Sequence, residues 1–201
     1  MSTGLASLKR FIERPPPVEI CELCSTRLAE QHEHVIQPRT RRILCACTAC
    51  AILFDSGTTR TEYRRIPRDI RYLGDFQIDD GLWNSLMIPI GLVFFFFSSA
   101  ANRIVAFYPS PAGATEAEVD PELWGEIVEL NPVLRKMIPD TEALLANRVQ
   151  NQREYYIAPI DECYRLTGLI RKHWSGFSGG SEAWDAIRDY FAGLKKRSAH
   201  A

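Results

Sequence analysis

Five of the six cysteines fall within one stretch of thirty residues, and this clustering constrains the fold more than any other feature of the chain. Two pairs, Cys21 with Cys24 and Cys47 with Cys50, have the Cys-x-x-Cys spacing. In that spacing a tight turn aims both sulfurs at one point, and two facing turns supply the four thiolates of a closed structural zinc site. The sequence therefore predicts a tetrahedral metal site with these four cysteines as ligands.

The segment between the two pairs is typical of a β-hairpin. Residues 34–37 form the expected outgoing strand, residues 38–40 the turn and residues 42–45 the returning strand. This layout is that of a zinc ribbon. A ribbon of this length has almost no apolar core, so we expect metal binding to supply folding free energy.

Two further side chains are candidate ligands of the same site. On a strand, Cys45 and Cys47 point to the same face, so Cys45 could replace Cys47. We favour Cys47, because it forms the second turn with Cys50. His34 and its neighbour His32 could also reach the metal.

Zinc is the first choice of metal and iron the second. A single iron on four thiolates has the same geometry, but rubredoxin-like turns usually place glycine after the second cysteine, where positive φ is comfortable. Here those positions are Ser25 and Ala51, which weakens the iron interpretation. An iron–sulfur cluster ranks third, because Cys45-Ala46-Cys47 would crowd its ligands.

The rest of the chain predicts a larger α+β domain. We expect an N-terminal helix and proline-rich spacer over residues 1–17, the zinc-ribbon-like module over 18–60 and the α+β domain over 61–201. Within the module, residues 51–54 are expected to form a strand or an apolar lid over the metal. The 46% hydrophobic and 24% charged composition is ordinary for one medium domain with a small appendage.

The most apolar stretch, residues 90–97, is too short to span a membrane and predicts a strand buried on both faces. Residues 103–108 are its expected neighbour, and residues 142–149 and 155–160 are expected to form a hairpin. Helices are predicted after Asp79 or Asp80, after Asp120, after Asp161 and around Trp184–Leu194. The predicted fold is a central, largely antiparallel sheet with flanking helices, in which the isolated Cys163 is a core residue.

Charge is distributed unevenly along the chain. Residues 1–72 carry twelve basic and eight acidic side chains, whereas residues 73–201 carry twelve basic and seventeen acidic ones. A face that binds a protein partner, or that packs on the chain's own acidic half, explains this better than nucleic-acid binding, since the pI is below neutral. The predicted docking face consists of Arg39, Arg41, Arg42, Arg64 and Arg65.

The first residues lack the continuous apolar run of a signal peptide, and reduced cysteines in metal spacing agree with a cytoplasmic location. The sequence has no catalytic triad order, zinc-protease motif or nucleotide fingerprint. Whether the chain is an enzyme therefore stays open, and a non-enzymatic role is favoured. An enzyme using the loop at Ser110–Thr115, which is expected to connect a strand to a helix, is kept as an alternative.

Several phrases together resemble an uncharacterised family of bacterial proteins: CELC, CACTACAILF, VAFYPSPAGATE and APIDECYRLTGLIRKHWSGFSGG. Genes of that family lie beside those of uptake nickel–iron hydrogenases in actinobacteria and relatives. The residues that match its pattern are Cys21, Cys24, Cys45, Cys47, Cys50 and His34. The resemblance implies an accessory or maturation role near a hydrogenase, and it implies no reaction.

The favoured function is thus a metal-binding accessory protein that docks on a protein partner, such as a hydrogenase subunit or maturation factor. The main alternative is a rubredoxin-like iron protein with a redox or metal-delivery role, in which Cys45 is an exchange ligand.

Overall fold

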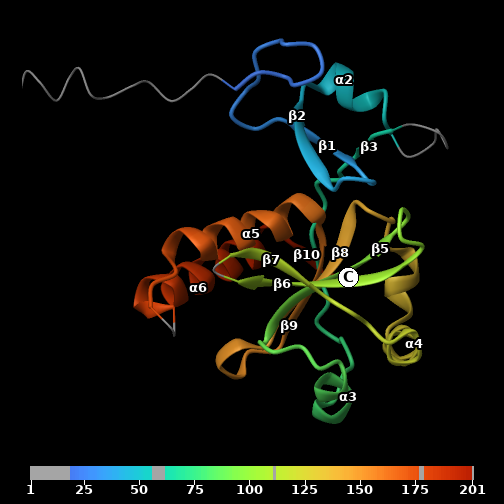
Figure 1. Cartoon of the computed structure of the whole chain (residues 1–201), viewed down its shortest axis with the longest axis vertical. Coiled ribbons are helices and arrows are strands. Elements are labelled where there is room, and N and C mark those ends of the chain that lie inside the picture. The colour runs from blue at the N-terminus through green and yellow to red at the C-terminus, as the bar shows by residue number, and fades with distance from the viewer. Residues whose placement is uncertain (1–18, 56–61, 111, 177–178, 201) are drawn as a thin grey trace, which may run out of the picture.

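The computed structural model describes residues 19–55, 62–110, 112–176 and 179–200, so the helix and spacer expected over 1–17 lie outside the described residues. The described chain contains one sheet of three strands and one of seven. Figure 1 shows the small sheet at one end of the molecule, above the large sheet and its helices. This arrangement confirms the predicted α+β class with a zinc-ribbon-like N-terminal part.

The hairpin predicted between the cysteine pairs is present. Strands β1 (Glu33–Gln37) and β2 (Arg42–Ala46) pair antiparallel, with His34 opposite Cys45. The turn closes through the Arg41 N–H, which donates to the Gln37 carbonyl at 2.8 Å. Strand β3 (Arg64–Arg65) pairs with the other edge of β1, so the small sheet extends to residue 65. The division into 18–60 and 61–201 stays a prediction.

The strand that was one expectation for residues 51–54 is wrong, because a short helix, α2 (Thr48–Ile52), begins this segment. The other expectation, an apolar lid, agrees with the buried Ala51 and with Phe54, which packs against the cluster around Cys21. Cys47 is the N-cap of α2, with its sulfur accepting from the Cys50 N–H at 3.5 Å. The sulfurs of Cys47 and Cys50 face one point because the chain turns at Cys47. The helical hydrogen bond from the Ala51 N–H to the Cys47 carbonyl continues this turn. Leu53, at the end of α2, is 67% exposed and covers nothing within the described chain.

The large sheet is almost wholly antiparallel. Its order is β10-β4-β9-β8-β5-β6-β7, and only β10 and β4 pair parallel. The strands are β4 (Arg71–Tyr72), β5 (Leu92–Ser98), β6 (Arg103–Ser110), β7 (Gly113–Ala117), β8 (Glu142–Asn147), β9 (Glu154–Pro159) and β10 (Ala199–His200). The loop expected at Ser110–Thr115 to connect a strand to a helix is corrected: residues 113–117 return as β7 beside β6, with Ser110 opposite Gly113.

Helices flank both faces of this sheet, as predicted. They are α3 (Asp80–Ser85), α4 (Pro121–Leu130), α5 (Ile160–His173) and α6 (Gly180–Arg197), with short 3-10 turns η1 (Pro132–Lys136) and η2 (Val149–Asn151). Asp79 and Asp120 cap α3 and α4 as expected. Asp161, however, lies in the first turn of α5 after the N-cap Pro159, so its carboxylate is left for other partners.

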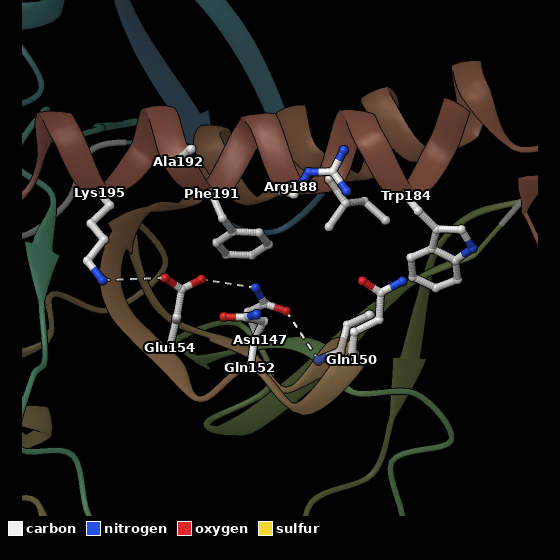
Figure 2. Close-up of a pocket in the computed structure, with 11 residues that line it drawn as sticks. Asn147, Gln150, Gln152, Glu154, Trp184, Arg188, Phe191, Ala192 and Lys195 are labelled. Carbon is white, nitrogen blue, oxygen red and sulfur yellow. Dashed lines mark hydrogen bonds and ion pairs between the residues drawn. The ribbon is translucent and has the colours of Figure 1, made fainter. Parts of the chain in front are cut away.

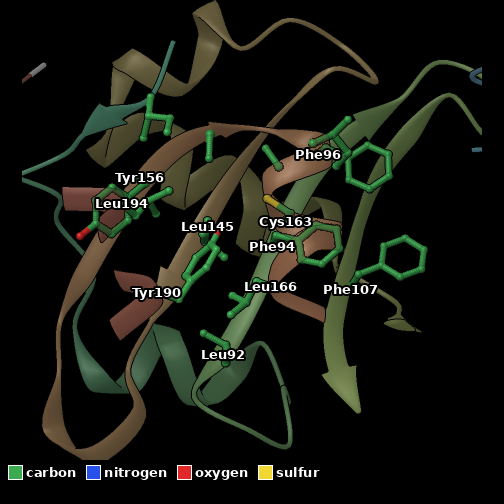
Figure 3. Packing of buried hydrophobic residues seen from close by; sticks show 14 of the residues in the cluster. Leu92, Phe94, Phe96, Phe107, Leu145, Tyr156, Cys163, Leu166, Tyr190 and Leu194 are labelled. Atoms are coloured by element: carbon green, nitrogen blue, oxygen red, sulfur yellow. The ribbon is translucent and has the colours of Figure 1, made fainter. Parts of the chain in front are cut away.

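Strand β5 has its two faces in two different cores. Phe94 and Phe96 pack with β6, β8 and the helices α5 and α6, together with the buried Cys163 (Figure 3). Val93 and Phe95 face the opposite side, where α3, α4 and η1 cover the sheet. Each buried phenylalanine contributes about 1.5–3 kcal/mol, so this strand holds the two helical layers together.

Strand β1 joins the small sheet to the large domain. Ile36, with Ile43 of β2, packs into the core beneath α5, whereas Val35 and Leu44 point the other way, toward the cysteines. Ion pairs reinforce this junction: Arg41 lies 2.8 Å from Glu116, and Arg64 lies 2.9 Å from the buried Asp140. The ribbon is therefore fixed on the domain, with one face inward and one outward.

Gly91 tests the packing at the start of β5. A Cβ there would lie 2.8 Å from the carbonyl carbon and oxygen of Arg148, whose N–H donates to the Gly91 carbonyl. We expect Gly91→Ala to lower the free energy of unfolding by about 1–3 kcal/mol, because backbone atoms would have to shift. Urea denaturation of the purified chain measures this.

The matched control is Gly193→Ala in the middle of α6, where a Cβ meets nothing within 4 Å. Alanine there should raise stability by about 0.5–1 kcal/mol, through helix propensity. Equal unfolding midpoints for the two variants would contradict the packing described for Gly91.

Candidate metal centre

The two Cys-x-x-Cys turns meet at one point. One ligand atom from each of Cys21, Cys24, Cys47 and Cys50 lies within 4.8 Å of the others. The sulfurs of Cys24 and Cys47 are 3.7 Å apart. A tetrahedron with metal–sulfur bonds of about 2.3 Å has edges of about 3.8 Å, so the separation of Cys24 and Cys47 matches one edge of a site for Zn²⁺ or Fe.

Backbone hydrogen bonds shape the first turn. The Ser25 N–H donates to the Cys21 carbonyl at 2.7 Å, and the Cys21 N–H donates to the Thr26 carbonyl at 2.8 Å. Ser25 has a φ of 62°, the left-handed conformation that glycine usually supplies after the second cysteine. The absence of glycine after Cys24 therefore does not disfavour iron, since Ser25 adopts the left-handed conformation that the turn requires. The four thiols form a site that could hold a metal ion, whose identity the geometry leaves open.

The core around these thiols is small. Among the described residues its five buried members are Cys21, Val35, Leu44, Ala46 and Ala51, and partly buried side chains that include Leu23, Leu28, Phe54 and Tyr63 pack against them. Such a core offers little hydrophobic free energy, so bonds to a metal would be a large part of what holds this outer face of the ribbon.

The surroundings divide the thiols into ones that ionise easily and ones that do not. The side chain and backbone N–H of Thr26, followed by the thiols of Cys21 and Cys50, lower the pKa of Cys24 to about 6. Burial opposes ionisation of Cys21, but the backbone N–H groups of Cys47, Leu23 and Cys24 outweigh it and lower its pKa.

Cys50 behaves in the opposite way. Its side-chain contacts with Cys24 and then Cys47, followed by desolvation, raise its pKa to about 12. Four sulfurs at this spacing cannot all be thiolates without a cation. A divalent ion would supply the compensating charge, which is the chemistry expected of a tetrathiolate metal site.

Cys45 and His34, the two candidate extra ligands, lie outside this group. They form a second group with His32, in which one ligand atom of each residue lies within 4.8 Å of the others. The alternation that was expected to place Cys45 beside Cys47 ends at Ala46, because Cys47 begins α2. Burial, followed by the charges of Glu19 and Glu22, raises the pKa of the Cys45 thiol.

The five arginines of the predicted docking face differ in their surroundings. Arg41 and Arg64 hold the ribbon on the domain, and Arg65 lies 3.2 Å from the carboxylate of Glu33. Arg42 is 66% exposed and pairs with Glu22 at 2.9 Å, and Arg39 is exposed in the hairpin turn. Much of the basic charge of the first 72 residues thus compensates acidic groups of this same chain.

The residues of the suggested enzymatic loop serve the β6–β7 hairpin. The Ser110 hydroxyl donates to the Gly113 carbonyl at 2.9 Å, and the Thr115 hydroxyl donates to Ser110 at 3.1 Å. A pocket of about 270 Å³ lies elsewhere, between α6 and the β8–β9 connection (Figure 2). Its lining includes Asn147, Glu154 and Lys195, and the Lys195 ammonium lies 3.7 Å from the Glu154 carboxylate.

Comparison with known proteins gives a family and no activity. Residues 20–198 match the model of a family of unknown function, DUF5947. No curated protein and no solved structure matches the chain. Among the helices of the described residues, none is long and apolar enough to cross a membrane.

Two serine variants separate the roles of neighbouring cysteines on the hairpin. Cys47→Ser should abolish the tightly bound metal ion, because it removes one corner of the tetrahedron, whereas Cys45→Ser should keep that ion. Elemental analysis of both purified variants after dialysis measures the difference. Loss of that ion from Cys45→Ser, with retention in Cys47→Ser, would reverse the assignment.

Proposed function

As the chain belongs to the DUF5947 family, whose function is unknown, we propose from its own geometry that it is a metal-binding accessory protein of the cytoplasm. Zn²⁺ on Cys21, Cys24, Cys47 and Cys50 stabilises the ribbon, and the ribbon docks on a protein partner. The partner is a subunit or maturation factor of a nickel–iron hydrogenase. The hydrogenase part of this proposal is supported by the family resemblance alone.

The observation that carries the proposal is the cluster of four thiols next to exposed apolar side chains. Ile52 and Leu53 come two and three residues after Cys50 and are 55% and 67% exposed. Ile20, which precedes Cys21, is 50% exposed. We call these three residues the ribbon tip. Exposed large apolar side chains on so small a module are typical of a protein contact surface.

The position of the ribbon tip supports docking. Figure 1 shows α2 on the side of the ribbon away from the seven-stranded sheet. The inner face of the ribbon is used for packing on the domain, through Ile36 and Ile43. The outer face is thus left for a partner, and the metal keeps its short helix in place although the core below it is small.

The arginines contribute in two ways under this proposal. Arg39 and Arg42 are exposed and would meet acidic groups of the partner, which aids encounter more than final affinity. Arg41, Arg64 and Arg65 act within the chain, where they hold the ribbon in a fixed orientation for docking.

A rubredoxin-like iron protein is the second candidate, and one observation favours it. The left-handed Ser25 gives the first turn the conformation that iron–tetrathiolate turns use. Elemental analysis and visible absorption of protein purified in air decide between the metals. Zinc thiolate is colourless and ferric thiolate is red, so a red protein containing iron would replace zinc in the proposal.

Removing the metal should loosen the ribbon and leave the domain folded. With a high-affinity chelator, amide hydrogen exchange should rise over residues 19–55, because their outer core is too small to persist alone. Exchange in β5, β8 and α5 should stay slow, since their cores contain no metal ligand. Unchanged protection of residues 19–55 in verified metal-free protein would contradict the structural role of the metal.

Charge at the ribbon tip should abolish docking. We expect Ile52→Asp/Leu53→Asp to lose co-purification with nickel–iron hydrogenase subunits or maturation factors, because a carboxylate cannot be buried unpaired at an apolar contact. Met87→Asp is the matched control, since Met87 is 84% exposed just after the C-cap of α3, outside the ribbon.

All variants should retain metal, which shows that the ribbon is folded. Recovery of no hydrogenase component by the unaltered chain would contradict the proposed partner. Equal recovery by the ribbon-tip and Met87 variants would contradict the proposed surface.

A further inference from the structure

The inner face of the ribbon carries a second group of metal-ligand side chains. His34 and Cys45 are directly opposite each other on β1 and β2. His32 lies two residues before His34, so the pleat directs it to the same side. Val35 and Leu44, which alternate with these residues, face the four-thiol cluster. The two groups of ligands therefore belong to opposite faces of one hairpin.

His32 has a buried nitrogen with no partner. Its Nδ1–H donates to the Ala29 carbonyl at 3.0 Å, and because a carbonyl can only accept, the proton must be on Nδ1. The lone pair of the neutral ring is then on Nε2, which is buried without a hydrogen-bond partner, in a side chain that is 8% exposed. An unsatisfied buried acceptor is costly, so this nitrogen lacks a proton donor or a Lewis acid.

His34 is oriented in the way that metal-binding histidines are. Its Nδ1–H donates to the Asp161 carboxylate at 2.7 Å, and the partner comes from the first turn of α5. A carboxylate on one ring nitrogen fixes the ring and makes the other nitrogen a stronger ligand. With Nδ1 engaged in this bond, Nε2 is the nitrogen that can bind a cation.

We propose that His32, His34 and Cys45 form a second cation site, which binds a borderline divalent ion such as Zn²⁺ through two imidazole nitrogens and one thiolate. Three protein ligands leave the fourth tetrahedral position for water or an added ligand, in contrast to the closed site of four cysteines. Metal–ligand bonds of about 2.0–2.3 Å place ligand atoms about 3.3–3.8 Å apart. The ligand atoms of the three side chains lie within 4.8 Å of one another, so any pair would close in by about 1.5 Å at most.

The local charges favour a cation at this point. The carboxylate of Glu19 lies 3.4 Å from His32 Nδ1, Asp161 holds His34, and Glu19 and Glu22 both act on Cys45. Arg68 is the cation that acts on His34, and it pairs with Glu33 at 3.2 Å. Glu22 is already paired with Arg42 at 2.9 Å, so Glu19 and Asp161 are the carboxylates beside the two histidines that would attract a divalent ion.

A purely structural explanation covers only part of this arrangement. An ion pair between His34 and Asp161 would tie the ribbon to α5 without any metal. That ion pair leaves His32 Nε2 without a partner. It also does not explain why the thiol of Cys45 lies opposite His34, close to both histidines. The three-ligand site accounts for all three side chains at once.

The experiment is a titration of the reduced, metal-stripped full chain with Zn²⁺ in competition with a chromophoric chelator. Two equivalents should bind per chain, one tightly and one more weakly. His32→Phe and Cys45→Ser should each lose only the weaker equivalent. Asp161→Asn should keep two equivalents and weaken the second by about 10–100-fold, because Asp161 positions His34 without touching the ion. His173→Gln, outside the group, is the matched control and should retain both.

The tight equivalent serves as the internal check that each variant has a folded ribbon. Titration with Co²⁺ gives an independent readout: the second ion should show weaker thiolate charge-transfer absorption than the first, since it has one thiolate in place of four. Binding of one equivalent by the unaltered chain would overturn the second site and leave the docking proposal standing. Retention of two equivalents by His32→Phe and Cys45→Ser would also overturn it.

Discussion

The convergence of four sulfurs on one point is the constraint on which the ribbon depends. The outer core there has only five buried residues among those that the structure describes, and several thiols in contact repel one another once they ionise. A bound cation would change the sign of that interaction, so that the same four sulfurs would attract a shared ion and hold the outer face of the ribbon. The inner face needs no such help, because Ile36 and Ile43 pack on a core that extends across the large sheet.

Most of the fold could be predicted because its signals are local. The hairpin between the cysteine pairs, the doubly buried β5 and the caps of α3 and α4 follow from turn residues, apolar run length and capping chemistry. The convergence of the four cysteines could be predicted for the same reason: spacing within each turn sets the direction of the sulfurs.

The errors arise where a non-local requirement overrides local pattern. The alternating pattern predicts that Cys47 continues the strand, but the turn between Cys47 and Cys50 makes Cys47 the N-cap of α2. Residues 113–117 have small side chains without strand character, yet pairing with β6 makes them a strand. The role of His32 depends on register, since only the pairing of His34 with Cys45 places all three side chains together. A His-x-His pattern facing a cysteine across the hairpin was the available signal.

The single five-residue strand β1 has a mechanical consequence. Its alternate side chains belong to the outer cluster and to the inner junction, and a strand with side chains on both faces cannot rotate about its axis without disturbing both. A change at the outer cysteine cluster would therefore affect the inner junction through β1. By thermodynamic reciprocity, the coupling free energy between these two faces is the same in either direction. The hairpin therefore connects α2, which follows β2 directly, to the first turn of α5, where Asp161 bonds His34 of β1.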